Sequence, residues 1–304
     1  MRDQLKPLLR SYELGLCAGD TESAAWAIHI FYQLRYLTSF SLDLCIADVE
    51  VYMPQMKELK QLVAYRSTLV NYQMFMNLAG RTDTDPLSLS GEYCTPENHA
   101  EWSEQDAFYF HHCRLWECYV RTMYGEHEEC AKLAIKYGHN TSVKSNPGAF
   151  SISMFEVISK GVSSAIAARQ TGKKSYKKIA LAIHRRLKDW IDKGNPNVAH
   201  LDAFMDAQFA AMKGKNFAAI KSFQVSIVIA ARGGLLLDAA MFSESFGEYL
   251  LERDDSEEAT FRLQEAIKYY REFGAHRKVM LLEEKHGNLW PKPAFVMATD
   301  IDIA

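Results

Sequence analysis

The chain has 304 residues, of which 48% are hydrophobic and 24% charged, with only 16 glycines and 8 prolines. This composition is typical of a globular protein and excludes a disordered, collagen-like or low-complexity chain. Thirty-five basic residues against 38 acidic ones leave a formal charge of −3, so we expect no nucleic-acid partner and no attraction of the whole surface to a membrane.

The cysteines and the first residues bear on the cellular compartment. None of the six cysteines belongs to a C-x-x-C pair; they are Cys17, Cys45, Cys94, Cys113, Cys118 and Cys130. Such diluted cysteines among apolar neighbours are typical of a reducing compartment. Residues 1–7 lack the apolar run of a signal peptide. The most apolar stretch, residues 222–242, contains Arg232 and Asp238, so we expect no transmembrane segment and a cytoplasmic protein.

Helical periodicity runs through almost the whole chain, and the alternation typical of strands is nearly absent. In residues 255–273, for example, Ala259, Leu263 and Ala266 recur at helical spacing before Gly274 ends the pattern. In chain order, helices are predicted near 2–17, 20–38, 41–65 (broken at Pro54), 66–79, 103–124, 126–138, 148–171, 174–193, 198–213, 216–232, 235–252, 255–273 and 275–286. Loops are predicted at 80–98 and 138–147, and a flexible tail at 291–304. We therefore predict an all-α protein with one unit over 1–290, or a subdivision of it near 80–100.

A faint repeat at the helix junctions makes the fold prediction more specific. Gly19, Gly125 and Gly214 each follow one predicted helix and open another, and Arg253 begins a similar junction without glycine. The last two junctions are 39 residues apart, close to the period of tetratricopeptide, HEAT and armadillo repeats. Each helical hairpin would bury its apolar face against the next. This pattern predicts a right-handed α-solenoid of antiparallel, tetratricopeptide-like hairpins.

Five segments also carry a family resemblance over roughly residues 8–288. They are 214–230, 239–250, 258–284, 24–32 and 190–196. Together they resemble the tetratricopeptide-like helical region of large STAND-type signalling ATPases, where that region lies between the ATPase module and GAF plus histidine-kinase or cyclase modules. The resemblance implies a non-catalytic interaction or relay module of signal transduction, with neighbouring ATPase or kinase modules as partners. The 304 residues contain neither module, so the resemblance implies no enzymatic activity.

In such a module, the concave face would bind a helix or peptide, and the stacked hairpins would transmit strain between a sensor and an output module. Aromatic and methionine side chains are enriched at adaptable binding surfaces. The residues proposed for this groove are Tyr65, Tyr72, Met76, Phe108 and His112. The alternative, which we favour for such residues in general, is that they fill gaps between stacked helices.

The segment 173–193 has the strongest charge asymmetry of the chain. An amphipathic basic helix can bind an acidic protein, a calmodulin-like protein or an anionic membrane. Its candidate partner surface comprises Lys173, Lys174, Lys177, Lys178, Arg185, Arg186 and Lys188. The simpler interpretation is a solenoid helix that packs its apolar stripe inward and turns its basic residues to water.

The rival hypothesis is an all-α enzyme or small-molecule sensor with a pocket between helices near His111 and His112. Its acids would be Glu101, Glu104 and Asp106. All-α enzymes commonly carry paired Glu-x-x-His motifs on facing helices, and the sequence has none. The densest group of metal-ligating types, which is His111, His112, Cys113, Cys118, His127 and Cys130, lacks the spacing of a structural zinc site. We therefore expect no catalytic residue, metal or cofactor, while the oligomeric state stays open.

Overall fold

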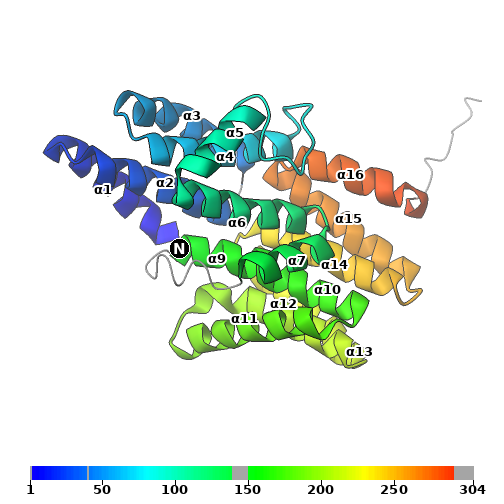
Figure 1. Cartoon of the computed structure of the whole chain (residues 1–304). Helices are drawn as coiled ribbons and strands as arrows, with labels where there is room; N and C mark the ends of the chain where they lie inside the picture. Colours follow the sequence, from blue (N-terminus) through cyan, green and yellow to red (C-terminus); the bar gives the residue numbers. More distant parts are fainter. Residues whose placement is uncertain (1, 40, 139–149, 291–304) are drawn as a thin grey trace, which may run out of the picture.

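The computed structural model describes residues 2–39, 41–138 and 150–290, and every regular element within these ranges is a helix (Figure 1). The α-helices are α1 (Leu5–Ala18), α2 (Thr21–Thr38), α3 (Leu42–Glu58), α4 (Leu62–Ala79), α5 (Pro96–Gln105), α6 (Ala107–Met123), α7 (His127–Tyr137), α9 (Phe150–Glu156), α10 (Ser163–Thr171), α11 (Lys174–Asp192), α12 (Ala199–Met212), α13 (Asn216–Arg232), α14 (Leu236–Leu251), α15 (Ser256–Phe273) and α16 (His276–His286). A π-helical turn, η2 (Val157–Val162), joins α9 to α10, and short 3-10 turns lie at Arg2–Gln4 (η1), Pro196–Val198 (η3) and Gly287–Leu289 (η4). The all-α prediction is confirmed for these residues.

The predicted break at Pro54 is wrong. α3 continues through Pro54 to Glu58, and the chain turns instead at Lys60, whose φ of 58° is left-handed. Proline removes one backbone hydrogen bond from a helix interior, but Val49 and Met56 on either side of it are buried. Their packing keeps this stretch helical, because tertiary burial outweighs a local propensity of a few kcal/mol.

The predicted helix 103–124 is in fact two helices, and the predicted loop 80–98 ends early. The side chain of Thr95 caps α5 by accepting a hydrogen bond from the backbone N–H of Asn98, and Pro96 occupies the first turn. The side chain of Asp106 separates α5 from α6 by accepting from the N–H groups of Phe108 and Tyr109. Both are ordinary N-cap signals. Thr95 lies within the predicted loop and Asp106 within the predicted helix. The tail 291–304 and most of the loop 138–147 lie outside the described residues.

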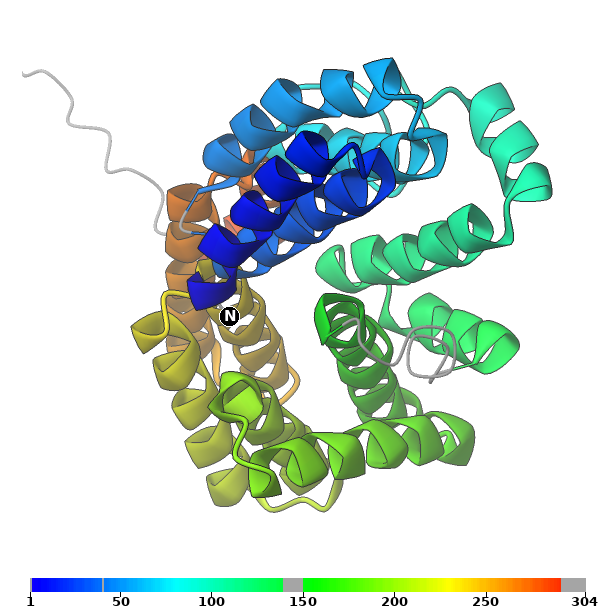
Figure 2. The same cartoon turned by 90° about the vertical axis from the view of Figure 1, so that its left-hand side faces the viewer.

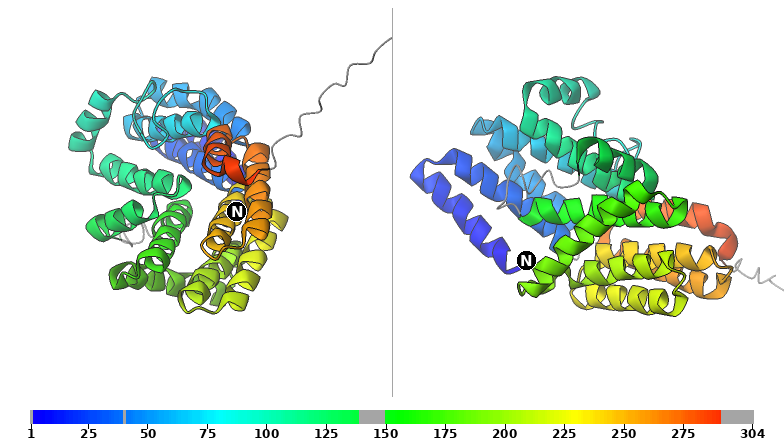
Figure 3. Two further views of the ribbon diagram at one scale, coloured as in Figure 1. Left: turned by 90° about the vertical axis from the view of Figure 1, so that its right-hand side faces the viewer. Right: turned by 60° about the horizontal axis from the view of Figure 1, so that its bottom comes forward.

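The repeated junctions share one backbone conformation. Gly19, Gly125 and Gly214 have φ values of 76°, 81° and 66°, which L-residues with a side chain rarely adopt. At the fourth junction, where glycine is missing, Asp254 takes the same left-handed turn with φ 62°. The consecutive helices therefore fold back on each other, and the pairs α12–α13 and α14–α15 pack along their lengths (Figure 3).

The two ends of the helical array meet, so that the helices follow one another around a ring (Figure 2). α16 packs against α4, and the ring centroid of Phe273 lies 5.8 Å from that of Tyr36. The guanidinium of Arg2 donates to the carbonyl of Gly234 at 2.8 Å. One continuous hydrophobic core extends from Tyr12 to Leu282, and it includes residues on both sides of the loop 80–95.

The segment through α9, η2 and α10 lies inside the ring, where every residue of η2 is buried. Glu156 and Lys160 form an ion pair there at 3.0 Å, and Arg186 of α11 reaches the other oxygen of Glu156 at 3.2 Å. Gly161 permits this burial, because a Cβ atom at that position would lie 2.7 Å from the Cγ2 of Ile183. Within the described ranges, no helix combines the length and hydropathy needed to cross a bilayer.

Candidate functional site

Two adjoining cavities form a cleft between α6, α7 and α10 on one side and α14 and α16 on the other. The inner chamber has a volume of about 100 Å³ and the outer cleft about 480 Å³. Both are lined by Gly125, Glu244 and Lys285, so they form one continuous site. The helices that face each other across it are far apart in the sequence but neighbours in the ring (Figure 1).

The inner chamber has an apolar wall and a polar wall. The apolar wall comprises Val162, Ile166, Phe204, Met241 and Phe242. The polar wall comprises Thr122, His127, Arg169, Gln170, Glu244, Ser245, Glu248 and Lys285. An apolar enclosure with a few convergent polar groups is the usual composition of a ligand site.

The two acids of the chamber are both paired with cations. Glu248 accepts from Lys285 at 2.6 Å and from His286 at 2.9 Å. Burial opposes its ionisation, but these hydrogen bonds lower the pKa of Glu248 to about 2. Glu244 accepts from Lys278 and from the hydroxyl of Tyr270, both at 2.7 Å. The carboxylates are therefore fixed in place before a ligand arrives.

The imidazole of His127 lines the chamber and stays uncharged at neutral pH. Burial, reinforced by the positive charges of Lys278, Arg169 and Lys285, lowers the pKa of His127 to about 3. Its Nδ1 lies 3.1 Å from the hydroxyl of Ser163. At neutral pH the imidazole can serve as a hydrogen-bonding group, but not as a cation.

The outer cleft is acidic. Its lining carries four acids against two lysines, and Asp85, Glu126 and Glu284 are exposed at the mouth. The inner chamber balances two acids against Arg169 and Lys285. The electrostatic field at the mouth therefore favours a positively charged molecule.

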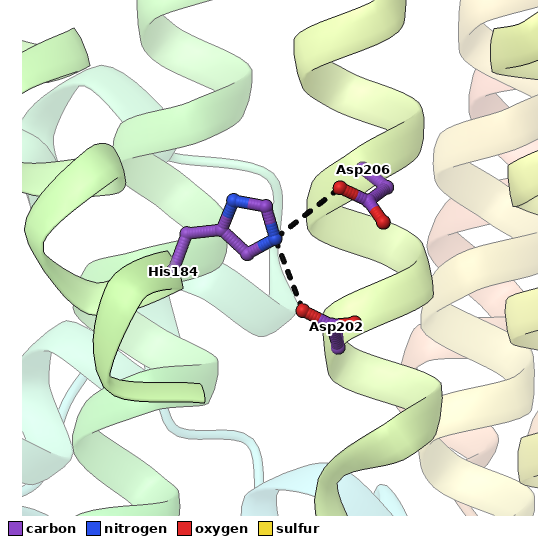
Figure 4. A group of neighbouring side chains, drawn as sticks. All are labelled: His184, Asp202 and Asp206. Carbon is purple, nitrogen blue, oxygen red and sulfur yellow. Dashed lines mark hydrogen bonds and ion pairs between the residues drawn. The ribbon is translucent and has the colours of Figure 1, made fainter. Parts of the chain in front are cut away.

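A second polar cluster lies between α11 and α12 (Figure 4). Nε2 of His184 is 3.1 Å from Oδ1 of Asp202 and 3.3 Å from Oδ1 of Asp206. These three ligand atoms lie within 4.8 Å of one another and could hold a metal ion. However, the ammonium of Lys188 already contacts Oδ2 of both carboxylates, at 2.8 and 3.1 Å.

The same cluster is fully satisfied as an ion-pair network. Burial opposes protonation of His184, but the hydrogen bonds to Asp202 and Asp206 outweigh it and raise the pKa of His184. Its stabilising contribution is thus present below the unfolded value of about 6.5 and is lost as the pH rises through the folded value. We interpret the network as a clamp between α11 and α12.

The proposed groove residues occupy different environments. Tyr72, Met76 and His112 are buried in the core, whereas Tyr65 and Phe108 are half-buried. His111 is exposed on α6 and His112 is buried, and neither lines the inner chamber or the outer cleft. Glu101 and Glu104 are exposed on α5, and Asp106 caps α6.

The basic segment forms α11, with its apolar stripe turned inward. Ile179, Ile183 and Leu187 are buried, so this stripe is not available to a membrane or a partner in this structure. The candidate basic residues are exposed except Arg186, which is half-buried and paired with Glu156. Lys173 pairs with Glu128, and Lys188 pairs with Asp202 and Asp206.

The sequence prediction missed most of the cleft. Among the residues that line it, the sequence singles out His127 as one of several metal-ligating types and Gly125 only as a helix junction. Arg169, Glu244, Glu248 and Lys285 come from three separate helices, and no local motif connects them. Comparison with protein-family models, with curated proteins and with solved structures finds no match to this chain.

Proposed function

We propose that this protein is a non-catalytic interaction module whose cleft binds an extended, positively charged segment of a partner protein. The observation that carries the proposal is the continuous cleft, which joins an acidic mouth to a smaller, electrically balanced chamber. A cleft of this size accommodates a few residues of an extended chain, with one side chain entering the chamber.

The position of the cleft supports a relay role. Its walls belong to the middle helices α6, α7 and α10 and to the C-terminal helices α14 and α16. A segment bound between them would contact both parts of the ring at once, and binding would favour one spacing of these parts. This proposal extends the relay function that the family resemblance implies. It proposes the cleft as the binding surface, in place of the groove residues of α4 and α6 that composition suggested.

Binding of fluorescent decapeptides, measured by anisotropy at low salt, tests the proposal. We expect a lysine-containing peptide to bind and its glutamate counterpart to bind much more weakly. The double substitution Glu126→Gln and Glu284→Gln should weaken binding of the basic peptide about tenfold, because each exposed charge contributes up to about 1 kcal/mol to the binding free energy.

The matched control is Glu257→Gln with Glu272→Gln, two exposed acids of α15 that do not line the cleft. These substitutions should leave the affinity unchanged. Equal binding of both peptides, or equal effects of the two double substitutions, would contradict the proposed site. Appreciable hydrolysis of ATP or of a small ester by the purified chain would contradict the non-catalytic role.

A further inference from the structure

A chain of hydrogen bonds leads from the chamber into the core. The hydroxyl of Thr122 lies 2.8 Å from the carbonyl oxygen of Cys118 and 2.7 Å from the hydroxyl of Ser163. The hydroxyl of Ser163 in turn lies 3.1 Å from Nδ1 of His127. Thr122 and Ser163 are buried.

The direction of these hydrogen bonds follows from counting protons. The hydroxyl of Thr122 also lies 3.2 Å from the carbonyl oxygen of Ser159. Carbonyl oxygens only accept, so the single hydroxyl proton of Thr122 points to these two carbonyls, of which that of Cys118 is nearer. Ser163 must then donate its one proton to the oxygen of Thr122. The oxygen of Ser163 can therefore only accept from His127, which requires the proton of the neutral imidazole to be on Nδ1.

The other ring nitrogen of His127 is left with a lone pair. Among the described residues, none forms a hydrogen bond with Nε2, and the His127 ring lines the chamber. The ring is held neutral by its burial and by the nearby cations. The chamber thus presents a fixed hydrogen-bond acceptor that cannot readily become a donor.

The surroundings restrict which group can donate to this acceptor. At the His127 ring, the positive charges of Arg169, Lys278 and Lys285 outweigh the opposing charge of Glu248, so a further cation next to Nε2 is disfavoured. A carboxylate has no proton to donate. A volume of about 100 Å³ holds roughly three water molecules or one group of comparable size. Arg169 uses two of its five N–H donors on Gln208 and Glu252, so a carbonyl oxygen would also find a donor in the chamber wall.

We propose that the inner chamber selects an uncharged primary carboxamide, the side chain of a glutamine or asparagine in the bound segment, by accepting its N–H at Nε2 of His127. This inference rests on the proposed function for the origin of the carboxamide, but the chamber itself can be tested with a small molecule. An isostere without the N–H displaces water from Nε2 without replacing its hydrogen bond, so it should bind more weakly.

Nuclear magnetic resonance of the ring nitrogens of His127 tests the chamber without any peptide. In the free protein, we expect Nδ1 to be protonated and Nε2 unprotonated. Acetamide should shift the Nε2 resonance, and acetate at the same concentration should not. Observation of the Nε2–H tautomer, or an equal response to both probes, would overturn the inference whether or not peptides bind.

Peptide binding provides the second measurement. A basic decapeptide with a central glutamine should bind about tenfold more tightly than the same peptide with glutamate or methionine. Ser163→Ala removes the acceptor for Nδ1–H, so it should reduce this preference several-fold and mix the two tautomers. Ser164→Ala, at a neighbouring buried serine outside the hydrogen-bond chain, is the matched control. It should preserve the preference for glutamine and the single tautomer of His127.

The outcomes separate the two proposals. If neither peptide binds but acetamide shifts Nε2, the proposed function fails and the chamber assignment stands. If the basic peptides bind with no preference for glutamine, the proposed function stands and the carboxamide inference fails.

Discussion

Acidification from about pH 7.5 to about pH 5 is expected to lower the free energy of unfolding by about 4 kcal/mol through His29 and His127 alone. Burial lowers the pKa of His29 to about 4, and burial with nearby cations lowers that of His127 to about 3. Below the unfolded pKa of about 6.5, these histidines become protonated in the unfolded chain but stay neutral in the folded protein. At pH 5 each histidine therefore costs about 2 kcal/mol.

Another histidine, which is buried in the core, lowers the stability in acid in the same way. Burial and the neighbouring His29, whose ring centroid is 5.3 Å away, hold the pKa of His112 well below its usual range. Single domains have a total stability of about 5–15 kcal/mol, so acid should remove a large part of it. The loss begins near pH 6.5, above the range in which ordinary carboxylates titrate.

Urea unfolding followed by circular dichroism at the two pH values measures this effect. His29→Gln should reduce the pH dependence by about 2 kcal/mol, since glutamine can keep hydrogen bonds to Thr68 and Gln33 without titrating. The exposed His276→Gln is the control and should behave like the unmodified protein. Equal stability at both pH values would show that these imidazoles are accessible to protons in the folded state.

Replacement of Lys160 by methionine is expected to cost about 3–5 kcal/mol of stability, because it leaves the carboxylate of Glu156 buried without its nearest cation. Both side chains are less than 5% exposed, and their charged atoms are 3.0 Å apart. Lys160 also donates to the carbonyl of Gly138 at 2.8 Å. Arg186 remains near Glu156, which keeps the expected loss within this range.

A double-mutant cycle isolates the pair from the rest of the site. The variant with both Glu156→Gln and Lys160→Met should lose about 1–3 kcal/mol less stability than the two single variants lose in sum. In the double variant, neither member of this pair is left as a charge without its partner. The same cycle on the exposed pair Lys193 and Asp189 is the control. There, the coupling free energy between the two side chains should stay below about 1 kcal/mol. Additive losses at Glu156 and Lys160 would mean that the two groups do not depend on each other.

The helices were predictable because the residues that become buried recur at helical spacing along this chain. α15 and α13 start and end within one residue of the predicted bounds, since their apolar residues recur at helical spacing between clear stop signals. The break placed at Pro54 failed for the opposite reason. There, the burial of Val49 and Met56 where α3 packs against α2 and α4 decides the structure, and the spacing around Pro54 alone does not show that burial.

The candidate site was much less predictable. The chamber depends on His127, Arg169 and Glu248 being brought together, and these residues lie on three helices whose order in space is set by the closing of the ring. Composition alone offers the aromatic and methionine residues as a candidate groove, with packing between helices as the favoured interpretation. In the structure, Tyr72 and Met76 are buried, which agrees with the interpretation of this cluster as packing between helices.

The contact between Tyr36 and Phe273 has a consequence for how the protein can evolve and be engineered. An open array of hairpins tolerates the gain or loss of a pair at either end, because each unit touches only its neighbours. Here the last helices also cover the first ones, so deleting α15 and α16 would uncover apolar surface on two sides at once. We expect the chain to melt in a single cooperative step and to resist modular lengthening.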